Sequence, residues 1–176
     1  MIRNYLLLCL LLLALSCKKT DPLPALTEDG RGTFVFRVDG EIWRPRTNDF
    51  LGSSVGARYL KDLRTLYIDA RNERTNTPIS VGLMQFDGIP GTYVIDSYCS
   101  SLPRSNANCG VFSYGLYLGI GNDFWTNSQF KGKIVITRCD NTIVSGTFEF
   151  EAQHPQTKKI VKITDGRFDI HYIDYF

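Results

Sequence analysis

Asp169 and His171 are the residues whose types and spacing come closest to a catalytic pair. Residues two apart in an extended strand lie on one face, so Arg167, Asp169 and His171 are expected on the same side. An aspartate beside a histidine can orient the imidazole as a general base. A solvated face of a terminal strand gives the same pattern, and no Ser or Cys stands in a nucleophile-elbow context. The sequence therefore predicts a structural face, no catalytic residue, and a protein that is not an enzyme.

Metal and cofactor chemistry finds little support in the sequence. The chain has 2 histidines, and no second Cys or His lies at the ligand spacing of a zinc site. The run Gly119-Ile120-Gly121 lacks the third glycine and the following helix of a dinucleotide-binding loop. The pairs Asn122-Asp123 and Asp140-Asn141 carry oxygens that could bind Ca²⁺, but each is also an ordinary turn pair. We therefore expect neither a metal nor a cofactor.

The best candidate for ligand binding is a segment rich in aromatic and polar side chains, which comprises Tyr114, Tyr117, Asn122, Asp123 and Trp125. Aromatic rings can stack on sugar faces while nearby polar groups bond the hydroxyls, which makes this segment a candidate glycan site. The alternative is that the rings alternate into the core, as aromatic side chains commonly do in strands. Because the residues around Trp125 are typical of a loop, we expect its ring to be at least partly exposed.

The N-terminus has the pattern of a secretory signal. Arg3 precedes an apolar run over residues 5–15, which is about 16 Å long as a helix. A membrane-spanning helix needs about 20 residues, so the run predicts a signal-peptide h-region and not a spanning anchor. The run ends in Ala14-Leu15-Ser16-Cys17, followed at once by Lys18 and Lys19.

This ending resembles the lipobox of bacterial lipoproteins, in which a small residue stands directly before an acylated cysteine. The resemblance implies cleavage before Cys17, a diacylglycerol on its sulfur, and N-acylation of the new terminus. Two or three acyl chains anchor a protein stably where one does not. Lys18 is not the Asp that signals inner-membrane retention in familiar systems, which favours the outer membrane. The alternative is an ordinary cleaved signal with a chance cysteine.

These features divide the chain into a signal peptide over residues 1–16, an acylated cysteine with a flexible tether over 17–32, and one domain over 33–176. The cell envelope is oxidising, which favours disulfides. Cys99 and Cys109 enclose a polar loop, so we predict a disulfide between them. Cys139 is then a buried free thiol, and the alternative is that it bonds one of the other two.

The domain is predicted to consist of strands. From Thr33 on, apolar residues recur with period two, and Asp39-Gly40 offers a two-residue hairpin turn that places Phe36 opposite Trp43. About ten short strands without crossover helices indicate an all-β fold, either an antiparallel β-sandwich or a barrel-like meander.

Two local features of the C-terminal half set its expected register. Asp165-Gly166 predicts a second hairpin turn, with Ile163 opposite Phe168. In the preceding pair of strands, a bulge near Gly146 allows the isoleucines of one strand to face the phenylalanines of the next, matching Ile134 and Ile136 with Phe150 and Phe148.

The same half resembles uncharacterised cell-envelope lipoproteins of Gram-negative bacteria, over residues 134–137, 144–150 and 163–169. The start of the domain is similar as well, with an alternating strand followed by Val38-Asp39-Gly40, Trp43 and Pro45. The resemblance implies fold and location; it implies no activity, since the family's function is unknown.

Composition narrows the function classes. The chain has 176 residues with 20 basic and 18 acidic side chains, so it lacks the basic excess of a nucleic-acid-binding protein.

The leading hypothesis is a membrane-anchored envelope lipoprotein acting as a non-catalytic binding or interaction module. A glycan-binding module of a polysaccharide-use system is the second hypothesis, and a hydrolase is the third. The expected partners are the membrane, through the lipid anchor, and a glycan or an envelope protein.

Overall fold

The structure is a computed structural model that describes residues 22–48, 52–98, 107–115 and 121–175. The described chain is all-β, as predicted, with a twelve-stranded sheet, one short 3-10 turn and no α-helix. The elements are β1 (Thr33–Val38), β2 (Glu41–Trp43), β3 (Val55–Leu60), η1 (Lys61–Leu63), β4 (Thr65–Asn72), β5 (Thr77–Leu83), β6 (Gly91–Ile95), β7 (Cys109–Ser113), β8 (Asp123–Trp125), β9 (Gly132–Cys139), β10 (Ile143–Gln153), β11 (Ile160–His171) and β12 (Ile173–Tyr175).

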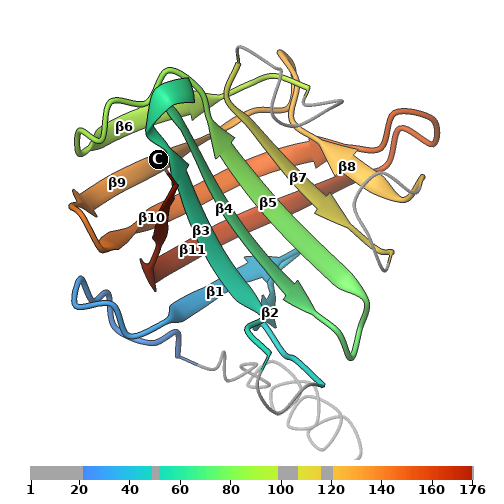
Figure 1. The fold of residues 1–176 in the computed structure, drawn as a ribbon. Coiled ribbons are helices and arrows are strands. Elements are labelled where there is room, and N and C mark those ends of the chain that lie inside the picture. The colour runs from blue at the N-terminus through green and yellow to red at the C-terminus, as the bar shows by residue number, and fades with distance from the viewer. Residues whose placement is uncertain (1–21, 49–51, 99–106, 116–120, 176) are drawn as a thin grey trace, which may run out of the picture.

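The sheet curls over on itself to form a half-barrel. Figure 1 shows β3, β4, β5 and β7 crossing in front of β9, β10, β11 and β1, and we call these sets the front layer and the back layer. β8 joins them at one corner, because it pairs with β7 and with the last residue of β10. β12 continues from β11 to the front layer and pairs with β3 in parallel, whereas the other strand pairs are antiparallel.

The core lies between the two layers and is filled by every second residue of most strands. Both layers contribute fully buried side chains, among them Phe36, Phe112, Phe168, Ile79, Ile134 and Ile163. The predicted first hairpin is confirmed: Phe36 lies opposite Trp43, and their rings stack with centroids 4.6 Å apart. Period-two patterning therefore identifies the buried face correctly where the strands are regular.

The predicted hairpin at Asp165-Gly166 is wrong, because β11 runs through it as one strand. Gly166 lies opposite Phe148 of β10, and Ile163 pairs with Val38 of β1. An Asp-Gly pair suits a bulge as well as a turn, since both use a positive φ, and Asp165 has a φ of 55°. Both halves of β11 already pair with β10 and β1, so the chain bulges instead of reversing.

The predicted bulge near Gly146 is confirmed, since the register of β10 against β9 shifts between Ser145 and Gly146. The resulting pairs are Gly146 with Ile136 and Phe148 with Ile134, two residues away from the predicted match. A Cβ on Gly146 would lie 2.0 Å from the carbonyl oxygen of Val135, so only glycine allows this close approach.

Residues 22–32, which we call the strap, lie against the sheet before β1 begins (Figure 1). They belong to the segment predicted as a flexible tether, and they form hydrogen bonds with β9 and β11. The signal peptide, Cys17 and the rest of the tether fall outside the described residues. Among the residues that are described, no helix is long and apolar enough to cross a membrane.

Candidate functional site

One carboxylate on β11 holds the strap against the back layer. Asp169 is only 1% exposed. It accepts a hydrogen bond from the Thr27 hydroxyl at 2.7 Å and from three consecutive N–H groups of residues 29–31 at 3.2, 2.8 and 3.2 Å. A fifth bond, 2.7 Å long, comes from the Ser145 hydroxyl on β10. We call this arrangement the clamp.

The clamp is built to hold a negative charge. Burial alone raises the pKa of the Asp169 carboxyl, but the hydrogen bonds from Thr27, Ser145 and the N–H groups of Gly30 and Arg31 outweigh it and hold that pKa well below its ordinary value. Successive backbone N–H groups that converge on one point form an anion-binding concavity. The carboxylate is therefore ionised at neutral pH and accepts every bond aimed at it.

The strap can enter this concavity because residue 30 is a glycine. Gly30 has a φ of 76°, and a Cβ there would lie 2.5 Å from Nε2 of His171. None of the five hydrogen bonds on Asp169 comes from His171, which is exposed. Arg167 donates to the carbonyl of Pro24 in the strap. The face predicted from the Arg167, Asp169, His171 spacing thus holds the strap, and its aspartate and histidine form no dyad.

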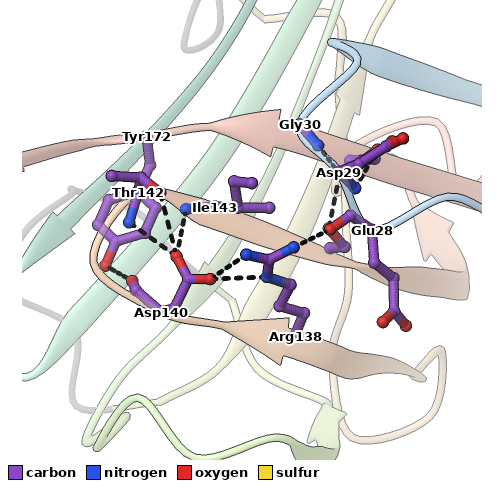
Figure 2. A network of polar contacts seen from close by, with 10 residues as sticks. Glu28, Asp29, Gly30, Arg138, Asp140, Thr142, Ile143 and Tyr172 are labelled. Carbon is purple, nitrogen blue, oxygen red and sulfur yellow. Dashed lines mark hydrogen bonds and ion pairs between the residues drawn. The ribbon is translucent and has the colours of Figure 1, made fainter.

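A second set of polar contacts fastens the strap to β9 (Figure 2). The Arg138 guanidinium donates to the carbonyl oxygen of Glu28, and its Nε donates to Asp140 at 2.6 Å. Glu28 therefore lies over the end of β9, one residue from the N–H groups that reach Asp169.

Asp140 also organises the turn between β9 and β10. Its Oδ1 accepts the N–H groups of Thr142 and Ile143, both at 2.9 Å, and the Tyr172 hydroxyl donates to its carbonyl (Figure 2). Those two N–H groups, and then Arg138, hold the pKa of Asp140 well below its ordinary value. The sequence offered the Asp140 carboxylate as a Ca²⁺ ligand, and in the structure it accepts hydrogen bonds from the backbone of the turn. Within the described ranges, no group of three or more acidic, Cys or His residues could hold a metal ion.

A groove runs beside the strap on the outer face of the back layer. It consists of two hollows of about 320 Å³ and about 270 Å³, both lined by Lys133 and Glu149. Leu26 of the strap borders the second hollow. Cross-strand ion pairs follow the groove, Lys133 with Glu149 at 3.2 Å and Lys162 with Glu151 at 3.6 Å. Volumes near 300 Å³ are at the lower end of small-molecule sites, so this charged groove is open to a polar ligand.

The structure does not bring the predicted aromatic site together. Trp125 is 9% exposed, so the expectation that its ring is at least partly exposed is wrong. It lies on the outer side of β8, where it clusters with Cys109 and Val111 apart from the main core. The Tyr98 ring packs on it with centroids 4.8 Å apart. The polar neighbours of Trp125 indicated a loop, but β8 pairs with β7 and leaves little of the ring uncovered.

Tyr114 is 50% exposed, and a ring that binds a ligand must be exposed. Its ring contacts Phe124 edge-on at 5.7 Å, and Phe124 points into the core. Asn122 is exposed, and its carbonyl accepts the Tyr114 N–H at 3.3 Å. Asp123 is buried, and Tyr117 lies outside the described residues. Of the five predicted residues, Tyr114 and Asn122 thus form an exposed pair.

The predicted cysteine scheme lies only partly within the described residues. No disulfide joins two described residues, and Cys139 is free. Cys99 lies outside the described residues, so its pairing with Cys109 stays a prediction. Burial raises the pKa of the Cys139 thiol to about 11, which keeps it protonated and unreactive at neutral pH.

Sequence reasoning missed the clamp. The signal present was an aspartate in an apolar strand, Asp169, together with a pair of glycines, Gly30 and Gly32, in the supposed tether. Neither feature predicts the other, because Gly30 and Asp169, which form a hydrogen bond in the fold, are 139 residues apart in the sequence.

Comparison with known families places the chain in a family. Residues 32–169 match a family model described as Domain of unknown function (DUF6252), so the chain belongs to this family. The match runs from the end of the strap to Asp169 itself. The comparisons with curated proteins and with solved structures found no match.

Proposed function

We propose that this member of the DUF6252 family is a membrane-anchored envelope lipoprotein, acylated at Cys17, that acts as a non-catalytic binding module. The observation that carries the proposal is the clamp, because it fixes the segment that leads back to Cys17 onto the folded domain. It also supports a non-catalytic role, since every bond to Asp169 comes from the strap or from Ser145.

The clamp shortens the free part of the tether. Pro24 is the first strap residue that the described contacts hold, and about seven residues separate it from Cys17, which reach at most about 25 Å when fully extended. The domain is then held near the membrane surface, with the groove next to the anchored segment. We propose the groove as the binding surface, because its paired charges lie on a rigid sheet and Leu26 of the strap forms part of its border.

The anchor is tested by cell fractionation of Cys17→Ala, with Cys139→Ala as the matched cysteine control. The expected result is release of Cys17→Ala from the membrane fraction, and mass spectrometry should find lipid on the wild-type N-terminus. Retention of Cys17→Ala together with a wild type that carries no lipid contradicts the anchor.

The groove is tested by photo-crosslinking in cells that express the full chain. A photoreactive residue replaces Lys133 in the groove or, as the control, exposed Lys159 outside it. We expect a discrete adduct at position 133 that the charge swap Lys162→Glu with Glu151→Lys, at the other ion pair of the groove, abolishes. Equal labelling at both positions, or an adduct that survives the swap, contradicts the groove as the binding surface.

A second candidate function is glycan binding, which the half-exposed Tyr114 ring beside exposed Asn122 favours. Its test is binding of the full chain to a panel of polysaccharides, with Tyr114→Ala compared with Tyr98→Ala, another half-exposed tyrosine. Loss of binding in Tyr114→Ala alone supports this function, and wild type that binds no polysaccharide removes it.

A further inference from the structure

Three exposed arginines of the described chain have side chains without an ion-pair or hydrogen-bond partner. Arg44, Arg46 and Arg74 have exposed side chains, and within the described ranges these form no ion pair and no hydrogen bond. Most other described arginines are paired with a carboxylate: Arg31 with Asp29, Arg37 with Asp165, Arg58 with Asp69, Arg64 with Asp87, Arg71 with Glu73 and Arg138 with Asp140. Arg44, Arg46 and Arg74 thus lack the carboxylate partner that most of the other described arginines have.

One buried side chain, that of Asn72, brings the backbone of the three arginines together. Asn72, at the end of β4, donates from Nδ2 to the carbonyl of Arg44 at 2.8 Å and accepts the N–H of Arg74 at 3.0 Å. Arg46 forms a parallel bridge with Asn72 itself. The N–H of Arg46 donates to the carbonyl of Arg71 at 3.1 Å. Residues 44–46, which follow β2, and the β4–β5 turn are thereby held side by side, and the side chains of the three arginines are exposed.

Glu73 is the carboxylate that the described contacts tie into this cluster, and it is already in use. Its side chain is 18% exposed, forms an ion pair with Arg71 at 3.2 Å and accepts the N–H of Asn48 at 2.6 Å. It therefore offers little to Arg44, Arg46 or Arg74. Guanidinium groups bind phosphate oxygens strongly and often through two parallel hydrogen bonds, which makes a phosphate-rich surface a suitable partner.

We propose that this arginine cluster, Arg44, Arg46 and Arg74, contacts the phosphate headgroups of the membrane to which the chain is anchored. The inference rests on the proposed lipid anchor, which brings the domain close to a phospholipid surface. In Figure 1 the described chain begins at the lower side of the molecule, and the β2–β3 connection and the β4–β5 turn also lie there. The cluster orients the domain, with that end toward the membrane.

The test measures vesicle binding by the mature chain, residues 17–176, carrying Cys17→Ala, so that neither an acyl chain nor the apolar run over residues 5–15 contributes. Vesicles contain phosphatidylcholine alone or with one-third phosphatidylglycerol. Each basic residue near an anionic surface contributes roughly fivefold in affinity, so the triple variant Arg44→Gln, Arg46→Gln, Arg74→Gln should bind the anionic vesicles on the order of 100-fold more weakly. High salt should remove the same difference, because it screens exposed charges.

The matched control is Lys131→Gln, Lys158→Gln, Lys159→Gln, which removes the same charge elsewhere on the surface. Circular dichroism melts establish that all variants are folded. The proposal is overturned if the arginine and lysine variants weaken binding equally, if the parent does not prefer anionic vesicles, or if it binds polygalacturonate beads but no vesicles, which would indicate an acidic glycan instead. Because these chains lack the acylated cysteine, failure of the anchor appears only in the fractionation of wild type and Cys17→Ala.

Discussion

The clamp and the aromatic region around β7 and β8 are both buried against the sheet, but by different means. In the clamp, a single charged group is buried, and most of its partners come from the strap, up to 142 residues away in the chain. In the aromatic region, Trp125, Val111 and Tyr98 bury apolar area within a short stretch of sequence. Directional bonds fix the position of the strap, whereas the burial of apolar area is a non-directional effect.

The contrast shows which region is suited to orient the molecule and which to stabilise it. A buried carboxylate must keep all its donors in place, because an unsatisfied buried charge is strongly unfavourable. Ring packing supplies more free energy for each residue but leaves the neighbouring segments less precisely placed. Substitutions in each region test this difference, and the loss of stability should be largest at Trp125 and smallest at Tyr114.

Trp125→Ala should lower the free energy of unfolding by about 3–5 kcal/mol, because the ring is buried against Val111 and Tyr98. Urea denaturation of the purified variant measures the loss. A change within about 0.5 kcal/mol would mean that the ring is solvent-exposed after all.

Asp169→Ala should lower the free energy of unfolding by about 2–3 kcal/mol, since the Ser145 hydroxyl and the strap donors lose their acceptor. The strap should also detach, so that trypsin cleaves after exposed Arg31 faster than in wild type. Trp125→Ala serves as the control, compared at a temperature where both variants are folded. Equal rates of cleavage in the two variants would show that the clamp does not position the strap any more than the aromatic region does.

The clamp also has a pH signature. The pKa of Asp169 is lowered in the folded state, so the unfolded chain binds the proton more readily. The stability difference between wild type and Asp169→Asn should therefore be constant at neutral pH and above. It should shrink as pH falls below the ordinary aspartate pKa of about 4. A difference that grows on acidification contradicts the clamp, and Trp125→Ala should show no such dependence.

Gly30→Ala should lower the free energy of unfolding by about 1–2 kcal/mol, because it combines a positive φ with a clash against the His171 ring. The double variant Gly30→Ala with His171→Ala should recover the part of the lost free energy of unfolding that is due to the clash. No recovery would show that backbone conformation alone requires the glycine.

Tyr114→Ala should have the smallest effect, less than about 1 kcal/mol, since half of the side chain is already exposed. Thermal unfolding measures it beside Trp125→Ala. A loss as large as that of Trp125→Ala would place Tyr114 in the core and remove it as a glycan-binding residue.

Local patterns predicted well where the partner of a residue lies nearby in sequence. The Asp39-Gly40 turn and the Phe36–Trp43 pair follow from the spacing within one short hairpin, and the bulge near Gly146 follows from the need to keep two apolar faces matched. The same reasoning failed at Asp165-Gly166, because turn and bulge use the same residues and only the neighbouring strands decide between them.

The sequence by itself determined the all-β class and the residues that line most of the core, because strand periodicity and hydrophobicity are local properties. The tertiary structure decided which aromatic rings are covered, that β12 crosses to β3, and that the strap belongs to the domain. Gly30, Ser145 and Asp169 meet only after β10 and β11 have paired and the chain ahead of β1 has folded back across them. No local pattern encodes such a meeting, because each residue alone is compatible with an exposed loop or strand.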